Sequence, residues 1–154
     1  NPRNRCLEAL NGAGLVYEQF EPGRPALRRL LKTYRMGFTD VVKPPTPGVA
    51  QLRASDYKKW APILKEKLLR YQPRICWFHG KVAYRNYLKH TGETDLEIDW
   101  GLQPHMIGES RVFVTPNPSP ANATFSLDDL IGWYKKLKQL RDRLETTPTG
   151  KTND

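Results

Sequence analysis

A phosphate-binding site could form at a pair of residues that comes shortly after an apolar run. Gly80 and Lys81 follow residues 75–78, Ile-Cys-Trp-Phe, and open a segment with helical spacing. Free backbone N–H groups, a helix dipole and an ammonium group would meet there, where glycine permits close approach. An ordinary strand-to-helix turn with a solvated lysine is the alternative. Nucleoside triphosphates and dinucleotides have no support, because the sequence contains neither a Walker loop nor a GxGxxG motif.

A second candidate lies in residues 113–125, FVTPNPSPANATF, which contain three prolines within five residues. Each proline fixes its own φ, so the loop should be pre-ordered and lose little entropy when it meets a partner. Asn117 and Ser119 add polar groups suited to phosphate or sugar oxygens. The alternative is a proline-stiffened connection that binds nothing.

The third candidate combines Asp40, near the end of the strand-like run GFTDVV, with Thr46 in the rigid loop KPPTPG. Together they could hydrogen-bond a water or a base edge, although a turn-capping aspartate is equally expected. No Ser-His-Asp arrangement can be assigned by spacing. No metal site is expected either, because the three histidines lack Cys or carboxylate partners at ligand spacing.

The charge of the chain favours a polyanionic partner. Twenty-five Lys and Arg against sixteen Asp and Glu give a net charge of +9, which favours nucleic acid first and an acidic membrane surface second. A generic solubilising surface is the alternative. No apolar run approaches the roughly 20 residues of a membrane span, which argues against membrane insertion. Cys6 and Cys76 are expected to be free thiols in a reducing compartment.

Hydrophobic spacing predicts the elements that must position these loops. Helices are expected over residues 4–11, 25–34, 55–71, 82–90 and 126–144, with a kink at Pro62. Strands are expected over 37–42 and 75–78, across 96–100, and on both sides of the turn at 108–110. Strands that alternate with helices of this length indicate one α/β domain over 1–145 with a layered, centrally parallel sheet, followed by a disordered tail at 146–154. In such sheets ligands bind outside the carboxyl ends of strands, where all three candidate loops would lie.

The motifs taken in order resemble a known family. NPRNR, GFTDVV-KPPTPG, YQPRICWFHGK, WGLQPH and VTPNPS, closing on WYKKLKQLRDRL, are similar to the thymine-DNA glycosylase and mismatch-specific uracil-DNA glycosylase family over residues 2–144. The resemblance implies a three-layer α/β/α sandwich with a mainly parallel sheet. It implies hydrolysis of the N-glycosidic bond of a uracil or thymine that is flipped out of a G·U or G·T mismatch in double-stranded DNA, without metal or cofactor. We expect a monomer, and we infer a nuclear protein from the substrate and the free thiols.

The resemblance also implies roles for individual residues. Asn117 and Ser119 would contact backbone phosphates beside the flipped nucleotide, and Asp40 and Thr46 match positions near the base and the attacking water. The wedge that enters the duplex would consist of Pro120, Ala121, Asn122 and Ala123. Relatives commonly present arginine or leucine there, so this wedge should retain the product site weakly.

One family motif is not found in these residues. The glycine-rich GINPG-like strand end, whose Asn positions the water, lies upstream of the NPRNR-like segment at which this sequence begins. The expectation is therefore a fragment of a larger glycosylase that lacks the N-terminal strand and is inactive on its own. A non-catalytic remnant that binds mismatched or abasic DNA, and an unrelated α/β ligand-binding or structural domain, are the alternatives.

Overall fold

The computed structural model describes residues 4–42, 52–94, 96–122 and 124–146, and these contain five helices and three strands. The helices are α1 (Cys6–Gly12), α2 (Arg24–Tyr34), α3 (Ala54–Tyr71), α4 (Lys81–Lys89) and α5 (Leu127–Thr146). The strands are β1 (Ile75–His79), β2 (Gly101–Leu102) and β3 (Arg111–Thr115). Residues 147–154 of the expected tail lie outside the described residues. None of the described helices combines the length and apolarity needed to cross a bilayer.

The sheet is small and mixed. Its order is β1-β3-β2, with β1 parallel to β3 and β2 antiparallel to β3. The α/β class expected from the sequence is confirmed. A three-layer sandwich with a mainly parallel sheet is not confirmed, because one of the two pairings is antiparallel, and it stays a prediction.

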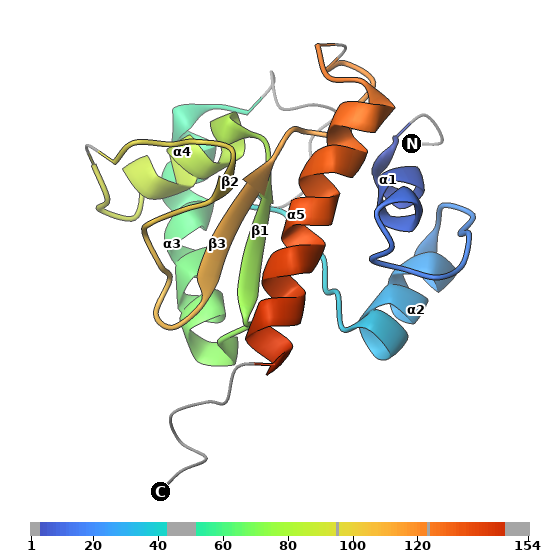
Figure 1. Cartoon of the computed structure of the whole chain (residues 1–154). Helices are drawn as coiled ribbons and strands as arrows, with labels where there is room; N and C mark the ends of the chain where they lie inside the picture. The colour runs from blue at the N-terminus through green and yellow to red at the C-terminus, as the bar shows by residue number, and fades with distance from the viewer. Residues whose placement is uncertain (1–3, 43–51, 95, 123, 147–154) are drawn as a thin grey trace, which may run out of the picture.

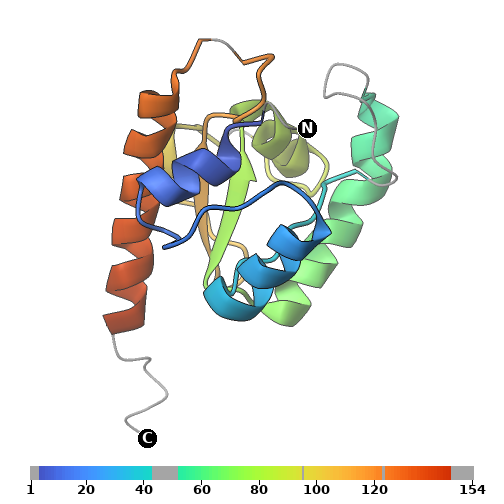
Figure 2. The same ribbon diagram turned by 90° about the vertical axis from the view of Figure 1, so that its right-hand side faces the viewer.

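Helices cover both faces of the sheet. Val112 and Val114 pack into a core with residues of α3 and α4, whereas Phe113 packs into a second core with residues of α1 and α5. Figure 1 shows α3 and α4 on one side of the strands and α5 on the other, with α1 beside α5. Figure 2, turned by 90°, shows the strands between α5 and α3. The alternation of strand side chains thus supplies two apolar faces.

Local signals place the helices correctly. The Asp129 N–H donates to Ser126 Oγ at 3.1 Å while the Ser126 N–H donates to Asp129 Oδ2 at 2.9 Å, a reciprocal cap that starts α5. Pro25 lies in the first turn of α2, where its missing N–H costs nothing. Pro62 lies inside α3, which continues past it to Tyr71.

Three expected strands are wrong. Before the turn at 108–110 only an isolated bridge forms, between Ile107 and Ser110. Residues 37–42 have no strand structure, and residues 37–40 are exposed. A strand needs a neighbour for its backbone groups, and among the described residues β1 pairs only with β3. Residues 96–100 also form no strand, and the carbonyl of Asp99 accepts a hydrogen bond from the Gln103 side-chain amide at 2.6 Å. Only Gly101–Leu102 pairs with β3 there.

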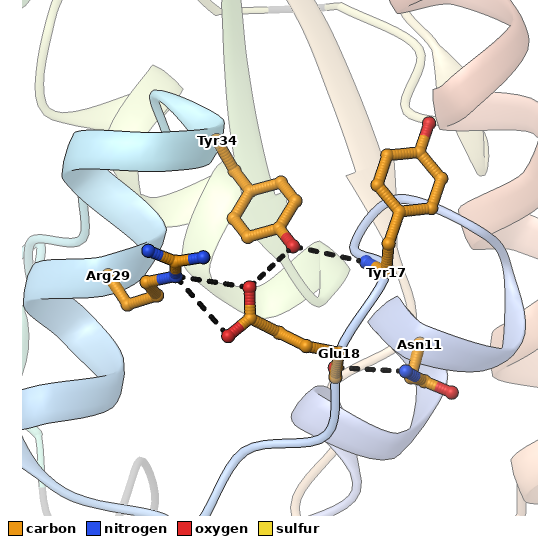
Figure 3. A network of polar contacts seen from close by, with 5 residues as sticks. All are labelled: Asn11, Tyr17, Glu18, Arg29 and Tyr34. Carbon is orange, nitrogen blue, oxygen red and sulfur yellow. Dashed lines mark hydrogen bonds and ion pairs between the residues drawn. The ribbon is translucent and has the colours of Figure 1, made fainter.

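A polar network fastens the segment after α1 to α2 (Figure 3). The Glu18 carboxylate accepts hydrogen bonds from Arg29 Nε at 3.1 Å and from the Tyr34 hydroxyl at 2.8 Å. The Tyr34 oxygen in turn accepts from the Tyr17 N–H, and Asn11 Nδ2 donates to the Glu18 carbonyl. The bond from Tyr34 is the largest cause that holds the pKa of Glu18 below its usual value.

The apolar stripe expected along residues 27–34 is only partly covered. Leu30 is fully buried, but Leu27 and Leu31 are 48% and 57% exposed. Helix α2 therefore leaves apolar surface exposed.

Candidate nucleic-acid interface

Two of the three predicted loops meet at one edge of the sheet. Because β1 and β3 are parallel, His79 and Thr115 end side by side, and the Gly80 N–H donates to the Thr115 carbonyl at 2.7 Å. A Cβ added to Gly80 would lie 3.5 Å from Cβ of Asn117. Gly80 has φ +94°, a value that favours glycine strongly. The structure thus brings Gly80 and Asn117 close together at the ends of neighbouring strands.

Lys81 begins α4 beside this contact. Its Nζ lies 4.6 Å from the ring centroid of Trp100, close enough for a cation–π interaction. The Trp100 ring in turn meets the Phe125 ring edge-on at 5.4 Å. The ammonium group is therefore held near the loop, rather than extended freely into solvent. No side chain caps the first turn of α4, which leaves backbone N–H groups near Lys81.

The segment of residues 116–125, called here the proline loop, is ordered by its own polar side chains. Asn117 Oδ1 accepts from the Ser119 N–H at 2.9 Å, and Ser119 Oγ accepts from the Ala121 N–H at 3.3 Å. In both bonds the side chain contributes an acceptor oxygen and no donor group. No described residue accepts a hydrogen bond from Asn117 Nδ2 or from the Ser119 hydroxyl, so both keep a donor for an outside group. Phosphate oxygens accept hydrogen bonds, and this pattern matches them.

The tip of the proline loop presents small side chains. Pro120 and Ala121 are exposed, whereas Asn122 is partly buried because its Nδ2 donates to the Asn117 carbonyl at 3.0 Å. Ala123 lies outside the described residues. Of the four expected wedge residues, Pro120 and Ala121 are the two that project from the described loop.

The third predicted pair is not joined to the other two loops. Asp40 is exposed in an irregular segment, and no hydrogen bond or ion pair links it to any described residue. Thr46 lies outside the described residues. Among the described residues, no polar interaction therefore joins Asp40 to the loops at Gly80 and Asn117.

Sequence reasoning missed Arg5. Its guanidinium group donates to four carbonyl oxygens of the proline loop, those of Pro118, Ser119, Asn122 and Phe125. A signal was present, because prolines supply carbonyl acceptors but no N–H donors, so a donor must come from elsewhere. Trp100, whose ring contacts the Lys81 ammonium group, was expected only as one side chain of a strand.

The floor beneath the two loops is aromatic and uncharged. Trp77 Nε1 donates to Thr115 Oγ1 at 2.8 Å, and the Trp77 ring lies 4.6 Å from that of His79. Burial lowers the pKa of His79 to about 4, so the imidazole is neutral at physiological pH. Positive charge at this edge therefore comes from residues such as Lys81 and Arg5, and His79 adds none.

In the part of the chain that the structure describes, no three His, Cys, Asp or Glu side chains lie close enough to share a metal ion. The arrangement instead offers uncharged donors, one ammonium group and a small exposed tip. A family model described as the uracil DNA glycosylase superfamily matches residues 6–143. The match spans all three strands and both loops that meet at the sheet edge.

Proposed function

The chain belongs to the uracil DNA glycosylase superfamily, and from that premise we propose that it is the DNA-gripping part of a glycosylase specific for G·U and G·T mismatches. Membership indicates a DNA glycosylase-type function with DNA as the partner. The reaction would be hydrolysis of the N-glycosidic bond of a uracil or thymine that has been flipped out of the duplex. The finer specificity, the nuclear location and the monomeric state remain predictions.

One observation carries this proposal: the donors of two separate loops face the same edge of the sheet. The Lys81 ammonium group lies against the Trp100 ring beside Gly80, and Asn117 lies next to Gly80 on the neighbouring loop. The free amide N–H of Asn117 and the hydroxyl of Ser119 add uncharged donors on the neighbouring loop. Phosphate oxygens take donors of both kinds, so these residues would position the backbone and leave the base to be read elsewhere.

The tip of the proline loop would act as the wedge. Flipping a nucleotide costs a few kcal/mol, which phosphate contacts and a filled gap in the stack can offset. Pro120 and Ala121 are exposed and small, so they would fill the gap only in part. We therefore expect weak retention of the abasic product and weak discrimination of the opposite base.

We further propose that these 154 residues alone do not cleave the bond. By the resemblance, Asp40 would lie near the attacking water, and no hydrogen bond or ion pair links it to the described residues of the gripping loops. One edge of β1 pairs with no described strand, and Leu27 and Leu31 leave apolar surface on α2. A further strand that carries the water-positioning Asn would suit both features. With it, Asp40 and Thr46 would help to orient the water.

The binding test uses the 154-residue chain with duplexes that contain one G·U pair, one G·T pair or only normal pairs. We expect tighter binding to the mismatched duplexes, and a fall in log Kobs with log[salt] of about 0.9 per phosphate contact. Equal binding to all three duplexes would remove the mismatch preference. Absence of binding to all three duplexes would contradict the proposed DNA-binding role.

The activity test measures abasic product from the G·U duplex. We expect none from the 154-residue chain, and product from a longer chain that includes the GINPG-like strand. Turnover by the short chain would contradict the proposed division of labour. The alternative function, binding of mismatched or abasic DNA without catalysis, is favoured if a longer natural chain also binds but never cleaves.

A further inference from the structure

The proline loop is fastened from outside by a residue of the N-terminal segment. Arg5 Nη1 donates to the Phe125 carbonyl at 2.6 Å, and its Nη2 donates to the Ser119 and Asn122 carbonyls at 3.3 Å each. The Nε group and the backbone N–H of Arg5 both donate to the Pro118 carbonyl at 3.3 Å. One side chain therefore spans the loop from residue 118 to residue 125.

The other bonds of the loop are local. Those made by Asn117, Ser119 and Asn122 join atoms two to five residues apart, so they shape single turns and do not fix both ends of the loop. Prolines stiffen individual φ angles but donate no hydrogen bond. The planar guanidinium fork is suited to several acceptors at once, and a lysine ammonium cannot reproduce that geometry.

The donors of Arg5 point into the loop. Every hydrogen bond that its side chain makes to a described residue ends on a loop carbonyl, and the side chain is partly buried. Its effect on a bound phosphate would thus pass through Asn117 and Ser119. Lys81 differs, because its ammonium group has no such carbonyl partner among the described residues and is placed to meet phosphate directly.

We propose that Arg5 is a positioning residue that holds the proline loop in its DNA-gripping shape without touching DNA. This inference rests on the proposed function, since it assigns Arg5 to the grip described above. It predicts that Arg5 and Lys81 weaken DNA binding in two distinguishable ways when they are replaced.

The test compares Arg5→Lys with Arg28→Lys in the full 154-residue chain. Both variants keep the net charge, and Arg28 is an exposed residue of α2. We expect Arg5→Lys to bind the G·U duplex about ten-fold more weakly with an unchanged salt slope, since loss of the fork loosens the loop and removes no phosphate contact. Arg28→Lys should bind as the unchanged chain does.

Amide hydrogen exchange supplies the second measurement. In Arg5→Lys the N–H groups of Ser119, Ala121 and Asn122 should exchange at least ten-fold faster, while those of β1 and β3 keep their protection. Unchanged loop exchange, or an equal loss of protection in both strands, would overturn the proposal. A salt slope lowered by about one would also overturn it, because it would show direct phosphate contact.

Two outcomes keep the inference separate from the proposed function. If the unchanged chain binds no DNA, the grip fails as a function, and loop exchange in Arg5→Lys still decides whether Arg5 orders the loop. If Arg5→Lys does not fold, amide exchange of the proline loop in the unchanged chain tests whether that loop is ordered. Loop amides that exchange there as fast as those of an unstructured peptide would overturn the proposal.

Discussion

The Gly80 N–H and the Thr115 carbonyl oxygen lie 2.7 Å apart and close the end of the parallel strand pair. This bond holds the start of α4 against the start of the proline loop. It also requires an unusual backbone conformation, since Gly80 has φ +94° and ψ 148°. Strand pairing, a left-handed glycine and the two candidate loops therefore depend on one another.

Replacing Gly80 by alanine tests this dependence. We expect Gly80→Ala to lower the free energy of unfolding by about 1–3 kcal/mol, because an L-residue is strained at that φ. DNA binding should also weaken, since relief of the strain at φ +94° would shift the junction between the two loops. Denaturant unfolding and duplex titration measure the two effects.

Gly132→Ala is the matched control. Gly132 lies in α5, and a Cβ added there meets no atom within 4 Å. The change should stabilise the protein by about 0.5–1 kcal/mol, because alanine loses less backbone entropy in a helix. A Gly80 variant as stable as this control would show that the loop junction tolerates a side chain.

Lys81→Gln should lower the salt dependence of DNA binding. Removal of one phosphate contact is expected to reduce the slope of log Kobs against log[salt] by about one. Lys136→Gln provides the comparison, because Lys136 Nζ lies 4.5 Å from the centroid of the Trp133 ring in a similar cation–π contact, and both residues belong to α5 and not to either loop. Equal slopes for the two variants would show that Lys81 makes no phosphate contact of its own.

The hydrogen bonds of the Glu18 carboxylate should make the stability of the folded protein depend on pH. The pKa of Glu18 is lowered from 4.5 in the folded protein, chiefly by the Tyr34 hydroxyl. Its contribution is therefore complete above pH 4.5 and is lost as the pH falls through the lower folded value. Tyr34→Phe should flatten the fall of the thermal midpoint between pH 5 and pH 3. An unchanged profile would show that other carboxylates dominate acid unfolding.

The thiol of Cys6 should react slowly with alkylating reagents. Burial raises its pKa to about 11, so only about one molecule in a thousand carries the thiolate at pH 8. We expect alkylation about a hundred-fold slower than that of an unfolded peptide, and Cys76, which is buried, should also be slow. Full reactivity should return in denaturant. Fast labelling of the native protein would show that α1 opens readily.

The sequence predicted what local rules decide. Ser126 with Asp129, Pro25 in a first turn and the apolar run at 75–78 each mark an element through neighbours within a few residues, and all three elements form. The strand expected at 37–42 is wrong because strand formation depends on a partner, which local pattern does not reveal.

The placement of the two loops could be predicted from the sequence, but their hydrogen bonds could not. Gly80 and Asn117 were expected outside the carboxyl ends of strands, and they follow β1 and β3 and lie close together. The use of Asn117 Oδ1 and Ser119 Oγ within the loop could not be read from residue types, because it depends on the loop's own backbone path. Arg5 was missed since its partners lie more than 110 residues away.

The same separation bears on how the molecule assembles during synthesis. Arg5 leaves the ribosome 120 residues before Phe125, whose carbonyl it binds. A contact between residues so distant closes only after almost the whole domain has emerged, whereas α1 can form at once. A nascent chain released early would thus contain most of its helices and no ordered proline loop. The proline loop would then reach its proposed DNA-binding shape among the last events of folding. Incomplete chains would therefore not compete for DNA.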